Sequence, residues 1–201
     1  MAQKTYEAWQ PRAANGLRPL QEALIQEHQS VRRLRGYMPS LVPGLLQTRG
    51  YATAVMGGII AFKGIKDDTE AAVAARMQRQ QILHEEGREF GVVMEEWVLR
   101  ARIGDTEVMA DQLGHLLSAL SLPGLSLGII PMSAHRERLP AEAFWIQDDV
   151  KVTVELTSGS LTVTESAEIE TYARTHAALA KMAVYDAHAR ALIEDARAAL
   201  G

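Results

Sequence analysis

The 201-residue sequence contains no cysteine. Disulfide bridges, zinc sites built on thiolates and cysteine nucleophiles are therefore excluded, and the absence fits a reducing compartment. The chain also has no run of about 18 apolar residues, the length that a membrane-spanning helix needs. Its first residues, MAQKTYEAWQPRAANGL, have no apolar core of the kind found in secretory signal peptides. We therefore expect a cytoplasmic protein without membrane association.

An excess of charge of one sign is also missing. The chain has 21 Lys and Arg against 25 Asp and Glu, a formal charge of −4. Nucleic-acid binding needs basic side chains gathered on one face, so we expect no direct contact with nucleic acid by this chain alone. Apolar residues make up 47% and charged residues 23%, as in an ordinary globular protein that buries a core.

Known catalytic and metal-binding motifs are absent as well. The sequence has no GxSxG, P-loop or GxGxxG motif, and its six histidines do not stand in HxH or HExxH spacing. We therefore expect no metal site and no cofactor.

Apolar spacing and chain breakers predict an α+β fold without repeats or a dividing linker. Residues 1–16 are polar and are expected to form an irregular arm before a single domain at 17–201. The strands should form a small, mainly antiparallel sheet packed against several helices, followed by a long C-terminal helix from residue 166 that is interrupted near Tyr185. Helices are predicted at 17–35, 51–61, 69–86 and 105–120, and strands at 90–94, 125–132, 142–149, 151–159 and 161–165.

The stretch SLVPGLLQTRGYATAV, residues 40–55, contains the first candidate for a binding site. Pro43 disfavours helical geometry in the residue before it, and Gly44 lets the backbone turn or approach a neighbour closely. Thr48 can cap the following helix. The stretch is either a packed corner between helices or the wall of a cleft that offers backbone groups and Gln47 to a ligand.

Two arginines and two glutamates form the second candidate. Arg76 and Arg79 stand three residues apart on a predicted helix, so they are neighbours that can bind carboxylates or an anionic ligand. Glu95 and Glu96 directly follow an apolar strand. Glu96 either pairs with one of these arginines or serves as an acid–base carboxylate at the end of the strand.

The segment PMSAHRERLPAEAFW, residues 131–145, joins two predicted strands and carries His135. Loops held at both ends by a sheet often bear binding residues, although a solvated loop explains the same composition. Glu155 lies in an apolar, threonine-rich strand and either faces solvent or lines a pocket. Trp97 and Trp145 are expected in the core or in a pocket wall.

Several blocks, in one order, resemble the C-terminal domain of actinobacterial XRE-type helix-turn-helix regulators, a domain of unknown function also called an antitoxin-regulator domain. The resemblance covers residues 20–197. This chain departs from the family by having about 16 residues where a helix-turn-helix usually precedes the domain, and by a 132–143 loop that keeps His135 but lacks glycines. The blocks are VPGLLQTRGYATAV, RMQRQQIL, EEWVLRARIG, VMADQLGHLL, LPGLSLGIIP, AFWIQ, VTVEL and ALIEDA.

The resemblance implies a stand-alone module that binds a small molecule or a small partner protein. The expected cleft lies among the 43–47 corner, the two arginines, Glu96 and the 132–143 loop. The alternative is a cofactor-independent biosynthetic enzyme, a cyclase, isomerase or lyase, in which Glu96 or Glu95 and His135 exchange protons. Apolar positions of the terminal helix serve either the core or a homodimer interface. The expected ligand-binding residues are Gln47, Arg76, Arg79, Trp97, Trp145 and Glu155.

Overall fold

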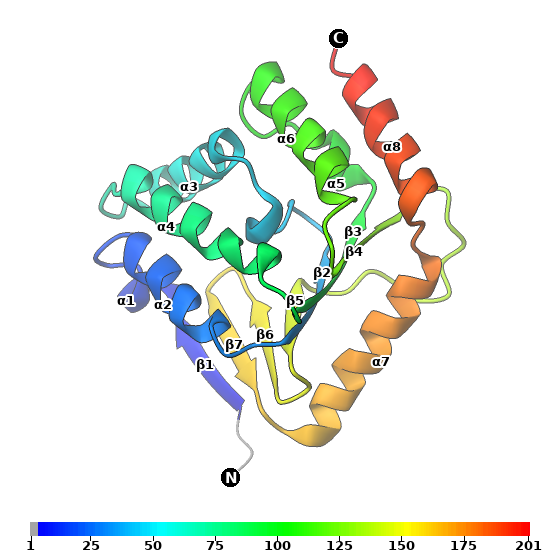
Figure 1. Ribbon diagram of the computed structural model, residues 1–201. Coiled ribbons are helices and arrows are strands. Elements are labelled where there is room, and N and C mark those ends of the chain that lie inside the picture. Colours follow the sequence, from blue (N-terminus) through cyan, green and yellow to red (C-terminus); the bar gives the residue numbers. More distant parts are fainter. Residues whose placement is uncertain (1–3) are drawn as a thin grey trace.

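A computed structural model describes residues 4–201, which are built around one seven-stranded sheet (Figure 1). The strand order is β1-β7-β6-β5-β2-β3-β4. Neighbours among β2, β3 and β4 are parallel, and the remaining neighbours are antiparallel. The fold is α+β as predicted. The predicted small, mainly antiparallel sheet is not exact, because the sheet has seven strands and is mixed, with four antiparallel and two parallel neighbouring pairs. The strands are β1 Lys4–Ala8, β2 Arg33–Met38, β3 Glu89–Glu95, β4 Leu125–Ile130, β5 Phe144–Gln147, β6 Lys151–Glu155 and β7 Gly159–Val163.

Helices cover both faces of the sheet. Helix α7 packs on one face, and α2, α3, α4, α6 and α8 lie on the other (Figure 1). Two short 3₁₀ helices, η1 Gly44–Leu46 and η2 Gln80–His84, connect elements on the second face. The α-helices are α1 Trp9–Arg12, α2 Arg18–His28, α3 Arg49–Lys63, α4 Thr69–Arg79, α5 Trp97–Arg100, α6 Thr106–Ala119, α7 Ser166–Met182 and α8 Asp186–Ala198.

Alternation along the strands sends side chains to two separate cores. Tyr37 and Val93 pack beneath α7, in a core that also contains Val154. Leu34 and Val92 point the opposite way, into the core shared with α6 and α8. The face that a side chain at the end of a strand occupies is therefore set by whether it lies an even or an odd number of residues from these core positions.

The helix predicted at 17–35 is wrong in its second half. Helix α2 ends at His28, and residues 33–38 form the interior strand β2, paired with β3 and β5. Gly36 belongs to this strand, where a Cβ would lie 2.5 Å from the ring of Trp145. The glycine thus leaves room for the tryptophan ring and does not end a helix. The segment forms a strand because pairing with two neighbouring strands outweighs the local helical spacing.

The predicted irregular arm is also partly regular. Strand β1 pairs with β7 at the sheet edge, and α1 follows directly. The predicted interruption near Tyr185 is confirmed, because α7 and α8 are separate helices. Between them, Val184 forms an antiparallel bridge with Ile129 of β4. No helix in the described residues 4–201 is long and apolar enough to cross a membrane.

Candidate functional site

The predicted site residues divide into two groups on opposite faces of the sheet. Glu95 is two residues after Val93 in β3, so its side chain points to the same face of the sheet, where it accepts a hydrogen bond from Tyr37. Glu95 therefore lies on the α7 face. Glu155 follows Val154, whose side chain packs beneath α7, so Glu155 points to the opposite face. The single cleft expected from the sequence is therefore divided by the sheet itself.

On the α7 face, the buried Glu95 carboxylate has three hydrogen-bond donors. The Tyr37 hydroxyl donates to Oε1 at 2.8 Å, and Arg136 donates to both oxygens at 2.8 and 2.6 Å. The hydrogen bond to Glu95 raises the pKa of Arg136, and burial together with Glu95 raises the pKa of Tyr37. Arg136 thereby ties the 131–143 loop to the end of β3.

Glu96 is also paired, although not with Arg76 or Arg79. Its Oε1 accepts from Nη2 and Nε of Arg100, one turn later, at 3.0 and 3.2 Å, and its Oε2 accepts from the backbone N–H of Met132 at 2.9 Å. Both glutamates therefore hold neighbouring segments in place. The acid–base alternative requires a carboxylate without a full salt bridge, so this geometry does not favour it.

Two other predicted residues on this side are open to solvent. His135 lies exposed on the loop. Trp97 has 44% of its surface exposed, so it is neither a core residue nor an enclosed wall, in contrast to the expectation.

On the opposite face, the 43–47 corner packs tightly against α4 and η2. Gln47 is buried; its Nε2 donates to the carbonyl of Val42 at 2.7 Å, and its Oε1 accepts from Nη1 of Arg76 at 2.6 Å. Gln80 of η2 donates to the carbonyls of both Gly44 and Gln47 at 2.8 Å. The corner is thus a packed joint that also orients an arginine.

The side chains of Arg76 and Arg79 both reach this corner, where the described residues offer them few hydrogen-bond partners. Arg76 donates from Nε to Gln21 at 3.1 Å in addition to its bond with Gln47, so its hydrogen-bond partners are neutral amides. Arg79 is only 7% exposed. Within residues 4–201 its guanidinium has no ion pair, and its Nε is buried without a hydrogen-bond partner. A Cβ on Gly44 would lie 2.6 Å from Nη2 of Arg79, so the glycine leaves room for this group.

Burial lowers the pKa of both arginines. The pKa of Arg76 falls to about 10, and that of Arg79 falls to about 9, because the nearby charge of Arg76 adds to the effect of burial. Glu155 offsets part of both shifts, but it forms no ion pair with either guanidinium among the described residues. Because both pKa values lie above 7, this corner carries two positive charges at neutral pH.

Three further residues on this face were missed by sequence reasoning. Gln21 accepts a hydrogen bond from Arg76, whereas Thr153 Oγ1 and His28 Nδ1 are buried and have no hydrogen-bond partner among residues 4–201. Thr153 shares the orientation of Glu155 and pairs in register with Trp145, which is partly buried. The polar residues in the alternating stretch KVTVE signalled a polar face, but spacing alone could not indicate which helix covers it.

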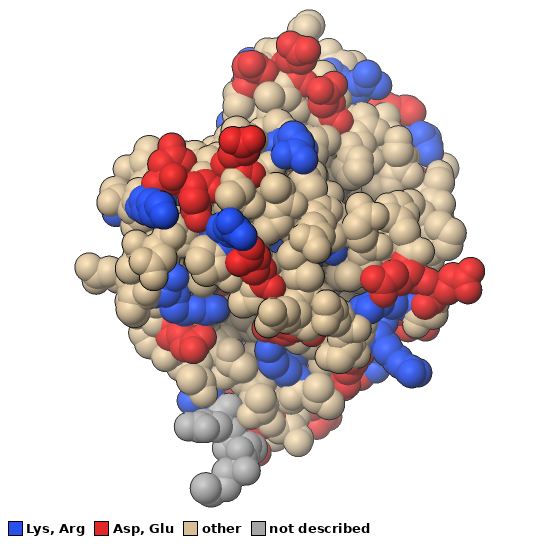
Figure 2. Space-filling view, turned by 60° about the vertical axis from the view of Figure 1, so that its left-hand side comes forward, with Lys and Arg blue, Asp and Glu red and all other residues tan. Residues whose placement is uncertain are grey.

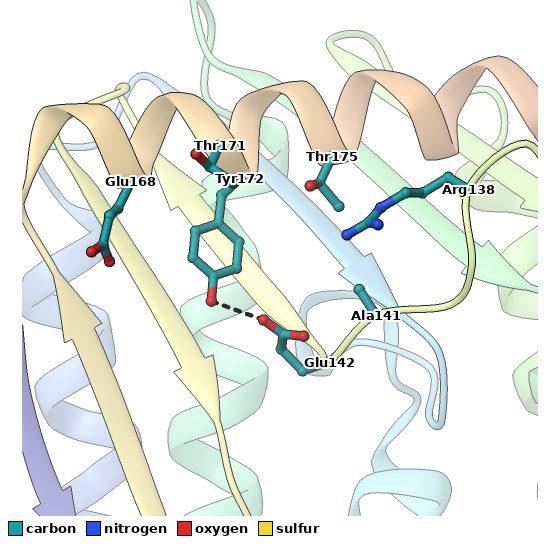
Figure 3. A pocket seen from close by; sticks show the side chains of 7 residues that line it. All are labelled: Arg138, Ala141, Glu142, Glu168, Thr171, Tyr172 and Thr175. Atoms are coloured by element: carbon teal, nitrogen blue, oxygen red, sulfur yellow. Dashed lines mark hydrogen bonds between the residues drawn. The ribbon is translucent and has the colours of Figure 1, made fainter.

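Two hollows on the surface lie elsewhere and contain none of the predicted site residues. A cavity of about 220 Å³ lies between the loop and α7, where the Tyr172 hydroxyl donates to Glu142 at 2.8 Å (Figure 3). A broader depression of about 940 Å³ includes Asp67, Asp68 and Glu70. Figure 2, which brings the α1–α4 side forward, shows Lys and Arg interspersed with Asp and Glu. No group of three or more His, Asp or Glu side chains suited to a metal ion occurs in the part of the chain that the structure describes.

Residues 21–195 match the model of the domain of unknown function DUF5753, and the chain belongs to that family. Among solved structures, it is similar to Nuc, a phospholipase D family member from Salmonella typhimurium, and to NucT from Helicobacter pylori. Both are 12% identical, with TM-scores of 0.45 and 0.47; the matches cover 92% of this chain and 97% and 99% of those chains. A comparison with curated proteins finds no match.

Proposed function

We propose, from the resemblance of its sequence blocks, that the chain is a binding domain related to the effector domain of XRE-type regulators, and that it receives a small molecule. The proposed site lies between the α2–α4 layer and the strands β5 and β6. The sequence blocks that resemble those regulators support the relationship, since nearly all of them lie within residues 21–195.

The observation that carries the proposal is the presence of buried polar atoms without partners in one layer of the molecule. Arg79 Nε belongs to α4, and Thr153 Oγ1 belongs to the strand face that points toward this layer. Buried polar atoms in folded proteins nearly always have a hydrogen-bond partner, and an exception calls for a bound group or water. A small molecule in this layer would supply the missing partners.

Burial also favours a small molecule over a partner protein at this position. The Arg79 side chain is only 7% exposed, so a flat protein surface docked on the outside would not contact it. A compact ligand that enters beside the partly exposed Arg76 could reach the deeper guanidinium. This arrangement resembles ligand sites in which a few polar groups inside an enclosed region determine orientation.

Native mass spectrometry of the protein purified from cells that produce it naturally tests the proposal. We expect a fraction of molecules to carry a bound small molecule, which denaturation releases for identification. The Thr153→Val variant, which removes a buried hydroxyl with little change of volume, should carry less of it. Thr171→Val, at an exposed position of α7 on the other face of the sheet, should match the wild type. Copurification of a protein without any small molecule would contradict the proposal.

A further inference from the structure

The two guanidiniums at the end of α4 form no ion pair among the described residues, unlike other largely buried arginines of this molecule. Arg88 and Arg136 each lie within 2.7 Å of a glutamate oxygen. Arg79 is more deeply buried than these two, yet the described residues provide it with no ion pair. A buried charge without a counter-charge is strongly unfavourable, so its retention indicates that an anion occupies this place for part of the protein's working cycle.

The geometry around Gly44 brings the two guanidiniums together. A Cβ at this position would lie 2.6 Å from Nη2 of Arg79 and 3.3 Å from Nε of Arg76, so both groups converge on the same stretch of backbone. The Gly44 carbonyl is already bound by Gln80, and Gln47 holds Arg76 from the side. Neutral amides thus position the arginines without neutralising them.

We infer that Arg76 and Arg79 form the anion-binding part of the ligand site and that the ligand presents an oxyanion, either a carboxylate or a phosphate. Guanidinium groups bind both oxyanions through paired, charge-assisted hydrogen bonds. The inference rests on the proposed function, because it names the ligand class of the same site. Glu155, on the same face, and Glu27 of α2 moderate the positive potential at Arg79, but neither forms an ion pair with it among the described residues.

The two surface hollows do not offer a comparable site. In the smaller one, Glu142 already accepts from Tyr172 (Figure 3). In the broader one, Asp68 accepts from the backbone N–H groups of Leu17 and Arg18, and Asp67 accepts from Thr69. The carboxylates of Glu142, Asp67 and Asp68 therefore serve the fold.

Thermal unfolding and calorimetric titration with sodium phosphate and sodium acetate, each against sodium chloride at equal ionic strength, test the inference. We expect one of the two oxyanions to bind and to raise the melting temperature more than chloride does. A response to phosphate indicates a phosphate site, and a response to acetate indicates a carboxylate site. Arg79→Gln should weaken binding by about 10- to 100-fold, since it removes a charged hydrogen-bond donor. Arg138→Gln, on the exposed loop, is the matched control and should bind like the wild type.

Arginine Nε–H signals in NMR spectra of the wild-type protein provide a readout that does not depend on the stability of any variant. We expect one buried Nε–H signal, assigned to Arg79, to shift on titration with the responding anion. The inference is overturned if neither anion exceeds chloride and no such signal moves. If the small molecule found by mass spectrometry is neutral or cationic, the inference fails while the proposed function stands. If no small molecule is found at all, the proposed function fails.

Discussion

Arg136 donates to both carboxylate oxygens of Glu95, at 2.8 and 2.6 Å, and thereby fastens the 131–143 loop to the sheet. Glu95 is 5% exposed, so the loss of its partner would leave a buried negative charge. The remaining donor is the Tyr37 hydroxyl, which brings no opposite charge. This pair makes the loop part of the fold rather than a free flap.

Replacement of Arg136 by methionine should therefore lower the free energy of unfolding by about 2–4 kcal/mol, because one partner of a largely buried pair is removed. Urea denaturation at neutral pH measures the change. Arg138→Met on the same loop, where the arginine is exposed, should stay within about 0.5 kcal/mol of the wild type. Equal stability of the two variants would show that the pair contributes little.

A side chain at Gly44 should disturb the arginine corner. In Gly44→Ala, the new Cβ meets Nη2 of Arg79 at 2.6 Å, so we expect a loss of about 1–3 kcal/mol from overpacking. In Gly57→Ala, within α3, the Cβ meets no atom within 4 Å, and the better helix former should add about 0.5–1 kcal/mol. Chemical denaturation of both variants should thus give changes of opposite sign; a shared sign would argue against the close approach at Gly44.

Asp68 should stabilise a helix to which it does not belong. Its carboxylate accepts from the backbone N–H groups of Leu17 and Arg18, both at 2.8 Å, at the start of α2. Asp68→Ala leaves these donors unsatisfied and should cost about 1–2 kcal/mol, as the loss of a helix cap does. Hydrogen exchange should then accelerate in the first turn of α2. Glu70→Ala, at an exposed position of α4, should leave exchange in α2 unchanged.

Acid should weaken the fold through His28. Burial and the charge of Arg79 lower the pKa of this imidazole to about 4, against about 6.5 in the unfolded chain. Between these values only the unfolded state takes up the proton, so stability falls as pH falls. From pH 7 to pH 5 the contribution is about 2 kcal/mol. His115 and His176, whose pKa values are also lowered, act in the same direction.

Urea denaturation at pH 7 and pH 5 of the wild type, His28→Gln and His135→Gln separates this contribution. His28→Gln should show the smaller loss on acidification, and His135→Gln, at an exposed position, should follow the wild type. An unchanged pH dependence in His28→Gln would mean that the buried imidazole is not responsible.

Local signals predicted the helices whose ends are determined within a few residues. Thr48 accepts from the N–H of Tyr51 at the start of α3, and Asp105 accepts from the N–H of Val108 at the start of α6. The Thr48 cap was predicted from the sequence, because such a donor and acceptor are three residues apart. Strand β2 was not predicted, because its identity depends on β3 and β5, which lie about 55 and 110 residues later in the chain.

The candidate site was predicted only in part, because some of its contacts join segments that are far apart in the chain. Gln47 and Arg76 were both named from the sequence, and the structure brings them into contact at 2.6 Å. One of the two interpretations of Glu96 paired it with Arg76 or Arg79, but its partner is Arg100, four residues later in the chain. Local spacing could have found that pair, whereas the contact between Gln47 and Arg76 depends on how η1 packs against α4.

The amino-acid order alone determined the class of fold, most helix limits and the adjacency of two arginines, since these depend on neighbours within a turn or two. Which face of the sheet each strand-end side chain occupies was decided only in three dimensions. A shift of one residue in alternation moves a carboxylate from one side of the sheet to the other. That alternation placed Glu95 beneath α7 with Arg136, whereas Arg79, on the far side of the sheet, has no ion pair among the described residues.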